Sequence, residues 1–174
     1  MDLAPQVNNV IIALDQATNV TGYAIFVNGD LKEFGHTKFD GDYLIRIVQL
    51  RDMIQNLIQE YKEDSLTFAI EDIQLQKIPG STQEANVLTY KKLAHVQGVL
   101  LELFTELYVD YIVVPSATWR STCNIKGRSR ADKKKAAQEY VKNTFGIKAT
   151  QDEADAICIG QHILLSKDKD FDWS

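Results

Sequence analysis

Short apolar runs and alternating segments in the first part of the chain predict three β-strands. Residues 10–14 are continuously apolar, which is typical of a buried strand, and this run ends at Asp15. Residues 21–27 alternate and are rich in β-forming side chains, and the dipeptide Asn28-Gly29 that follows is a strong hairpin signal. A third strand is predicted at residues 31–38. The chain is therefore expected to open with a three-stranded antiparallel meander.

Helical periodicity and short apolar runs then alternate along the chain. Apolar side chains recur at helical spacing over about residues 42–62 and predict an amphipathic helix. A fourth strand is predicted at residues 66–70, directly before Glu71, and a fifth at residues 109–114. A long helix over about residues 84–107 is predicted between them. Because helices connect these later strands, we expect the strands to run parallel to the first one.

Two more helices are predicted near the end of the chain, over about residues 131–145 and 151–165. The order of elements predicts an α/β fold: a mixed five-stranded sheet, in which an antiparallel meander is joined to parallel strands, with helices on both faces. The sequence contains no repeat and no linker, so residues 1–174 are expected to form a single domain. Residues from about 167 to 174 are expected to be a frayed tail.

The composition is that of an ordinary soluble globular protein. The chain has 174 residues, of which 45% are hydrophobic and 25% charged, and it is long enough to bury a core without disulfides. No segment approaches the ~20 apolar residues of a membrane span, and the first residues lack the features of a secretory signal. Cys123 and Cys158 have no metal-type spacing. We therefore expect a cytoplasmic protein with reduced thiols and no membrane contact.

The charged residues are unevenly distributed along the chain, and one segment differs from the average. A net charge of −5 disfavours binding to nucleic acid on average. The basic residues are concentrated in one stretch, however, in which Asp132 is the single acidic residue. They are Arg120, Lys126, Arg128, Arg130, Lys133, Lys134 and Lys135. A run of this kind is in general a solvated face of a helix and loop, but here it is also a candidate patch for binding phosphates.

Acidic residues stand at the ends of two predicted strands. Asp15 ends the first strand and Glu71 ends the fourth. Ligands of open α/β sheets bind beyond the carboxyl ends of parallel strands. If these two strands are neighbours, both carboxylates point into the same cleft.

A second pair of acids opens the last predicted helix. Thr150 and Glu153 fit a capping box, which fixes where this helix begins. Asp152 and Asp155 are three positions apart and therefore share one face of it. Taken singly, such acids have structural explanations, because first-turn acids favour the helix dipole and Asp is a common turn residue. Together with the two strand ends, they predict a functional cleft.

Clustered carboxylates repel one another, and a bound divalent cation removes this penalty. Mg²⁺ prefers hard oxygen ligands and often shares them with the phosphates of a substrate. Two such ions about 3.5–4 Å apart can activate water and stabilise the leaving oxygen in phosphodiester hydrolysis. We therefore predict two Mg²⁺ ions, which Mn²⁺ can replace, held by Asp15, Glu71, Asp152 and Asp155.

Four short motifs resemble the RuvC family of Holliday-junction resolvases, and most of all its bacteriophage-encoded branch. They are Ile12-Ala-Leu-Asp15, Val20-Thr-Gly22, Ala69-Ile-Glu71 and Asp152-Glu-Ala-Asp155-Ala-Ile157. Each motif is short, but their order and spacing match across nearly the whole chain. The resemblance implies an RNase H-like fold, a homodimer that nicks Holliday junctions and other branched DNA, and a location in the cytoplasm of a bacterial host.

The resemblance also assigns roles to individual residues. The four acids named above fall on the family's four metal-binding acids. Arg120 and one of Lys133 or Lys134 match basic residues that contact the scissile backbone, with Arg120 replacing the more usual lysine. The long helix at residues 84–107 corresponds to one that contributes to the dimer interface. Gln74 stands where the family often has an aromatic wedge, so forks and three-way junctions are also expected substrates.

The basic patch is expected to bind phosphates and to make the affinity for DNA salt-dependent. The candidate DNA-binding residues are Arg120, Lys126, Arg128, Arg130, Lys133, Lys134 and, in the loop after Glu71, Lys77. We interpret Trp119 as a core residue rather than a platform for stacking bases. Thr18 and Thr21 are assigned either to a turn or to a phosphate contact. The histidines are assigned structural or surface roles.

Two other functions stay open from the sequence alone. One is a phosphotransferase of the actin and sugar-kinase type, because residues 15–22 are vaguely similar to its phosphate loop, although the chain is short for two domains. The other is a non-catalytic module that binds branched DNA. Four acids in one cleft speak against such a module, because they repel phosphates and add nothing to binding.

Overall fold

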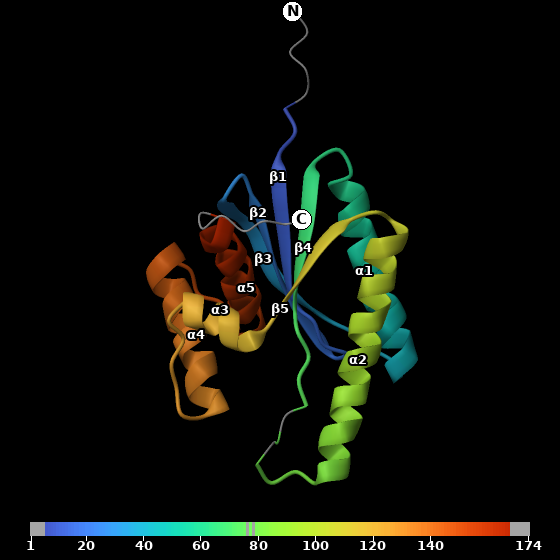
Figure 1. Cartoon of the computed structure of the whole chain (residues 1–174), viewed down its shortest axis with the longest axis vertical. Coiled ribbons are helices and arrows are strands. Elements are labelled where there is room, and N and C mark those ends of the chain that lie inside the picture. Colours follow the sequence, from blue (N-terminus) through green and yellow to red (C-terminus); the bar gives the residue numbers. More distant parts are fainter. Residues whose placement is uncertain (1–5, 76, 78, 168–174) are drawn as a thin grey trace, which may run out of the picture.

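The computed structural model describes residues 6–75, 77 and 79–167 and is shown in Figure 1. Its strands are β1 (Asn9–Asp15), β2 (Val20–Val27), β3 (Asp30–Lys38), β4 (Ser65–Glu71) and β5 (Asp110–Val114). Its helices are α1 (Tyr43–Glu60), α2 (Gln83–Glu106), α3 (Ser116–Thr122), α4 (Arg130–Phe145) and α5 (Gln151–Lys167). All predicted elements are present, and their bounds differ from the predictions by a few residues. The tail expected at residues 167–174 lies outside the described residues except for Lys167, which ends α5.

All five strands form one mixed sheet with the order β3-β2-β1-β4-β5. β1 pairs antiparallel with β2, and β2 with β3, which confirms the meander. β4 pairs parallel with β1 on one side and with β5 on the other. The register aligns the carboxyl ends of the parallel strands, because Leu14 lies opposite Ile70 and Glu71 lies opposite Val114.

Helices cover both faces of this sheet, with α1 and α2 on one side and α3, α4 and α5 on the other (Figure 1). In β1, Val10, Ile12 and Leu14 pack into the core beneath α1 and α2, whereas Ile11 and Ala13 pack into the core beneath α5. Both faces of the strand are therefore buried. This explains why its sequence is continuously apolar rather than alternating.

Close backbone approach fixes α5 against the sheet. A Cβ atom built on Gly22 of β2 would lie 2.1 Å from the carbonyl oxygen of Asp152, and one built on Gly160 would lie 2.4 Å from the ring of Phe26. Side chains at these two glycines would push the helix away. The first turn of α5 is thereby held against the end of β2 that pairs with Asp15.

Capping side chains set where the helices begin. Asp42 caps α1, so this helix starts at Tyr43 rather than at Asp42. Ser129 caps α4 in a reciprocal capping box with Asp132, so α4 starts at Arg130, one residue earlier than predicted. Asp132 therefore interrupts the basic stretch for a structural reason, since it satisfies the backbone of the helix start. None of the described helices combines the length and the apolar character that a membrane span needs.

Candidate active site

A cleft of about 440 Å³ opens at the carboxyl ends of β1 and β4. The first half of α2 forms one wall, and α3 and α4 form the other, on opposite sides of the sheet end in Figure 1. All four predicted acids line it: Asp15, Glu71, Asp152 and Asp155. The structure therefore brings together residues that are far apart in the sequence.

Two features of the fold make the acids converge. β1 and β4 are parallel neighbours, so Asp15 and Glu71 leave the sheet at the same edge. Asp15 is paired with Gly22 in the adjacent strand, and the backbone of Asp152 packs directly on that glycine. The strand ends and the start of α5 thus meet at one point. The hydrogen bonds between Thr150 and Glu153 confirm the predicted capping box at this start.

Gln16 extends the sheet beyond its last strand pair. Its side chain donates from Nε2 to the carbonyl oxygen of Glu71 at 2.6 Å, and its Oε1 accepts from the Glu71 amide at 3.1 Å. This buried amide imitates one more rung of the ladder between β1 and β4. It fixes the backbone that carries two of the four acids. Gln16 was not predicted as a site residue, because nothing in the sequence marks it except its place directly after Asp15.

Burial and mutual repulsion shape the charge of the acids. Burial, followed by the negative charges of Asp155 and Glu71, holds the pKa of Asp15 well above its usual range. Burial also raises the pKa of Glu71, against the lowering effect of the Trp119 indole N–H and of Arg120. The pKa of Asp155 is raised by burial despite the nearby charge of Lys134. Three carboxyl groups are therefore costly to ionise in the protein alone.

Two basic side chains reach into this acidic cluster. Lys134 Nζ lies 3.5 Å from Asp155 Oδ2 and 3.7 Å from Asp152 Oδ1. Arg120 Nη2 lies 4.0 Å from Glu71 Oε1, at the outer limit of an ion pair. Arg120 and one of Lys133 or Lys134 were predicted to lie near the site, and the structure places Arg120 and Lys134 at the acids.

Trp119 orients one of the acids. It is buried, with 1% of its surface exposed, so its interpretation as a core residue agrees with the structure. Its indole nitrogen donates to Glu71 Oε1 at 3.0 Å. The residue therefore contributes to the core and also holds Glu71 in place. Thr21 likewise has a turn role, since its hydroxyl both donates to and accepts from the backbone of Ala17.

The chemistry of the four acids fits a hard divalent cation. Their carboxylate oxygens are the ligands that Mg²⁺ prefers, and a cation would offset the burial and repulsion that raise the pKa of Asp15, Glu71 and Asp155. Within the described residues, however, no three acidic, histidine or cysteine side chains are gathered closely enough to enclose one ion. Lys134 is instead the cation that lies between Asp152 and Asp155.

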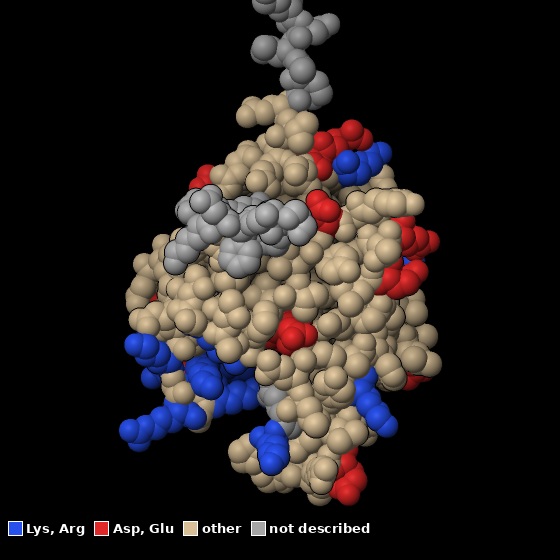
Figure 2. Space-filling view, in the orientation of Figure 1, with Lys and Arg blue, Asp and Glu red and all other residues tan. Residues whose placement is uncertain are grey.

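The predicted DNA-binding residues divide into two sets. Arg120, Arg130, Lys133 and Lys134 line the cleft. Lys77, Lys126 and Arg128 are exposed and lie outside its lining. Figure 2 shows Lys and Arg side chains gathered at the end of the molecule where α4 begins and the loop after β4 lies. Basic side chains therefore line one wall of an acidic cleft and gather at the same end of the molecule, in a protein whose net charge is negative.

The opposite wall has a different chemistry. Asn86, Thr89, Tyr90 and Leu93 of α2 line it, together with Gln74 in the preceding loop. None of these side chains is charged. The four α2 residues were not predicted, because nothing in the sequence distinguishes them from the rest of a long helix. Ser116 also lines the cleft and could have been found, since it lies two residues after the end of β5, where Pro115 stops the strand.

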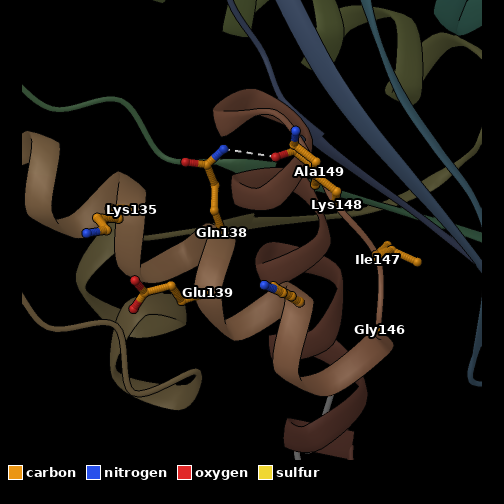
Figure 3. Close-up of a pocket in the computed structure, with 8 residues that line it drawn as sticks. Lys135, Gln138, Glu139, Gly146, Ile147, Lys148 and Ala149 are labelled. Atoms are coloured by element: carbon orange, nitrogen blue, oxygen red, sulfur yellow. Dashed lines mark hydrogen bonds between the residues drawn. The ribbon is translucent and has the colours of Figure 1, made fainter.

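A second hollow, of about 380 Å³, lies on another side of α4 (Figure 3). It is lined by Lys135, Gln138, Glu139 and Lys142 of α4 and by residues 146–149 of the following loop. Gln138 closes it at one end by donating to the carbonyl oxygen of Ala149 at 2.9 Å. The four predicted acids are absent from its lining. The last residue of the basic stretch, Lys135, therefore points away from the candidate active site.

The three histidines make contacts that agree with structural roles. His36 Nδ1 lies 2.7 Å from Glu153 Oε1 and ties β3 to the start of α5. His95 contacts the hydroxyl of Tyr43 at 2.6 Å. His162 is packed against Thr122. Glu153 is occupied by its cap and by His36, so it points away from the cleft, as expected from its place beside Asp152.

Known proteins match this protein in structure but not in sequence. A comparison of the sequence with family models finds no match, and neither does one with curated proteins. The structure resembles RuvC from T. thermophilus in complex with a Holliday junction substrate, with a TM-score of 0.69 and 12% identity over 92% of this chain and 96% of that chain. A second Thermus thermophilus RuvC structure gives a TM-score of 0.67 and 13% identity with the same coverage.

A eukaryotic structure shows the same likeness at a greater distance. The yeast mitochondrial Holliday junction resolvase Ydc2 matches with a TM-score of 0.54 and 14% identity, over 94% of this chain and 80% of that chain. At these identities the comparison establishes architecture. The chain has a RuvC-like, RNase H-like fold, as predicted.

Proposed function

We propose that the protein is an endonuclease that nicks Holliday junctions and other branched DNA with the help of divalent metal ions. One observation carries the proposal: four carboxylates from three separate segments converge in a cleft with cationic side chains on one wall, within a RuvC-like fold. A cluster of buried acids is costly on its own, and a metal-dependent reaction on phosphates gives it a use.

In this proposal Asp15, Glu71, Asp152 and Asp155 hold two Mg²⁺ ions, for which Mn²⁺ can substitute. When bound, these ions supply Lewis acidity, which lowers the pKa of a water and neutralises charge on the phosphate. The protein contributes the positions of the ligands. Trp119 and Gln16 hold the side chain and the backbone of Glu71, and the capping box holds the first turn of α5.

The basic side chains on the α3 and α4 wall of the cleft have a separate part in the proposed reaction, which is to bind phosphates. Arg120 and Lys134 lie at the acids and are able to donate to nonbridging oxygens of the scissile phosphate, whose negative charge they offset as the attacking water adds to phosphorus. Lys133 and Arg130 lie further along the same wall and bind flanking phosphates. Lys126, Arg128 and Lys77, which are exposed around the cleft, extend this contact along the arms of the DNA.

We further propose that the protein acts as a homodimer, because a four-way junction carries two strands to be nicked. Large apolar side chains on the surface of α1 and α2 support this. Leu44, Val48 and Leu88 are 67%, 53% and 55% exposed. A second copy that covers them would remove this apolar surface from water. Sedimentation of the protein, compared with a Leu88→Asp variant, tests the assembly.

The choice among branched substrates depends on the loop after β4. Gln74 lines the cleft and is exposed, and it stands where an aromatic wedge is usual in the family. We therefore propose cleavage of forks and three-way junctions as well as four-way junctions. An origin in a bacteriophage, and action in the cytoplasm of its bacterial host, rest on the sequence motifs alone.

One cleavage assay tests the proposed activity. Purified protein is incubated with four-way, three-way, forked and linear DNA of shared sequence, with Mg²⁺, with Mn²⁺ or with a chelator. We expect nicks near the branch point in the presence of either metal, and none with the chelator or with an Asp15→Asn variant. Binding without cleavage of any substrate would instead support a non-catalytic module, and hydrolysis of ATP without DNA would support a phosphotransferase.

A further inference from the structure

Two of the four acids in the cleft are placed by the first turn of α5 and not by the sheet. Asp15 and Glu71 lie within paired strands, which fixes their backbone. Asp152 and Asp155 keep their spacing from these two only if the turn stays at one height and one rotation above the strand ends. A displacement of about 1 Å in a group at a reaction centre can slow the reaction by about a hundredfold. The contacts that hold this turn are therefore important for the site.

Gly22 lets the turn approach the sheet but does not hold it there. The backbone of Asp152 packs on this glycine, which has no side chain to prevent the turn from sliding or rotating. His36 lies directly opposite Gly22 in the adjacent strand, β3. Residues paired across antiparallel strands project toward the same face of a sheet. The imidazole therefore lies on the face that carries α5, beside the space that the glycine leaves.

His36 connects β3 to this turn through Glu153. Its Nδ1 atom lies 2.7 Å from Glu153 Oε1, and the other carboxylate oxygen, Oε2, accepts from the Thr150 amide at 2.7 Å. One carboxylate thus joins an edge strand of the sheet to the start of the helix. Among the described residues, no other side chain of the sheet is hydrogen-bonded to residues 150–155.

This contact is poorly placed to stabilise the fold as a whole. The side chain of His36 is 45% exposed, whereas that of Glu153 is 12% exposed. Ion pairs that are open to water on one side contribute little to the free energy of unfolding. Outer partners that orient metal ligands have a larger effect, since their loss typically weakens metal binding by about ten- to a hundredfold. These magnitudes favour a role at the site over a role in stability.

We propose that His36 is a positioning residue for the acids of α5. Through Glu153 it fixes the height and the rotation of the turn that carries Asp152 and Asp155. This inference rests on the proposed function, since it requires these two acids to bind metal ions. His36 does not line the cleft and acts from the opposite side of the turn. The sheet thereby positions all four acids, two directly and two through this histidine.

Metal binding can be measured without DNA and without cleavage. Mn²⁺ is titrated into the full-length protein, and the paramagnetic resonance signal of the free ion gives the affinity. In His36→Ala the affinity should fall by about tenfold or more, as it does when other partners that orient metal ligands are lost. The melting temperature in a chelator should change little. His36→Asn should restore most of the affinity, because its amide nitrogen occupies the position of Nδ1 and can donate to Glu153.

Glu33→Ala is the matched control. It also removes a side-chain hydrogen bond from β3, in this case the one accepted from the Tyr23 hydroxyl at 2.9 Å. Tyr23 packs against the core beneath α1 and α2, so this bond lies on the other side of the sheet from α5. The affinity of Glu33→Ala for Mn²⁺ should therefore equal that of the wild type.

Four outcomes would overturn the inference: no binding of Mn²⁺ by the wild-type protein, an unchanged affinity in His36→Ala, a loss that His36→Asn does not restore, or an equal loss in Glu33→Ala. A protein whose Mn²⁺ affinity depends on His36 but which cuts no DNA would retain the inference and refute the nuclease. Cleavage of branched DNA with a metal affinity that is independent of His36 would do the reverse.

Discussion

The two hollows beside α4 carry similar numbers of basic residues but differ in their acids. Arg130, Lys133 and Lys134 point into the cleft, where four carboxylates from three other segments meet them. Lys135 and Lys142 line the second hollow, whose acid is Glu139 (Figure 3). Arg130 is three and four residues from Lys133 and Lys134, and Lys135 is seven residues from Lys142, so each set shares one helix face. The basic stretch therefore contributes to two separate surfaces. The four converging carboxylates mark the cleft as the candidate functional one.

The largest expected effect is a loss of cleavage when a carboxylate is removed from the cleft. It is compared with removal of a carboxylate from the second hollow. Asp155→Asn removes a carboxylate from the cleft without adding bulk, so cleavage should be lost while junction binding is kept. Glu139→Gln makes the same chemical change in the second hollow and should cleave like the wild type. Single-turnover cleavage and a gel-shift assay measure both properties. Normal cleavage by Asp155→Asn would mean that the acids of the cleft are not metal ligands.

Adjacent lysines give the next comparison. Lys134 lies between Asp152 and Asp155, whereas Lys135, one residue later, lines the second hollow. Lys134→Ala should slow cleavage by about a hundredfold, as expected when a donor to a developing charge is lost. Lys135→Ala should have little effect on the rate. Equal losses in the two variants would show that both act through net charge rather than through position.

A moderate effect concerns the stability of the protein without metal. The raised pKa of Asp15 means that the folded protein binds its proton more tightly than the unfolded chain does. Stability of the metal-free protein should therefore fall as pH rises from about 4 through the raised pKa, since ionisation is then more costly in the folded state. Asp15→Asn removes this cost and should raise the melting temperature at neutral pH, by about 2–4 °C for each kcal/mol relieved.

Thermal melts at several pH values check this expectation. The advantage of Asp15→Asn should disappear below about pH 4, where the wild-type carboxyl is protonated in both states. Added Mg²⁺ should raise the melting temperature of the wild type more than that of the variant. Glu139→Gln, at an acid outside the cleft, serves as the control. A variant less stable than the wild type at neutral pH would contradict the account.

The smallest effect is a change in salt dependence. Lys133→Ala removes one phosphate contact from the cleft wall, so the slope of log affinity against log salt should decrease by about 1. Lys142→Ala removes an equal charge from the second hollow and should leave the slope near its original value. Titrations of one junction at four salt concentrations are sufficient. A matching decrease for Lys142 would extend the DNA surface across both sides of α4.

The sequence predicted the elements and the acids because these depend on local patterns. Periodicity identified the strands and helices, and Asp15 and Glu71 were found because each directly follows an apolar run and ends its strand. The parallel pairing of β4 with β1 followed from the helices that connect them. A capping pattern placed Asp152 at the start of α5, and the structure agrees.

Contacts between distant segments could not be predicted in this way. Lys134 and Lys135 are neighbours in the sequence, and only the packing of α4 on α5 decides which of them meets the acids. Asn86 is one polar residue among many in a long helix, and its burial depends on how the helix packs in the folded protein. The pairing of His36 with Glu153 joins residues 117 positions apart. In each of these three cases, the position of a side chain depends on how its helix is rotated about its axis. The packing of the core determines this rotation.

Gln16 has a consequence for motion at the site. The amide proton of Glu71 is held by the Gln16 side chain, and not by a neighbouring strand, so its exchange with deuterium reports the opening of a single side-chain contact. That opening releases the backbone of Glu71 just beyond the last pair of the ladder, Leu14 with Ile70. Hydrogen exchange at this one amide therefore reports how often the end of β4 is freed while the rest of the strand stays paired.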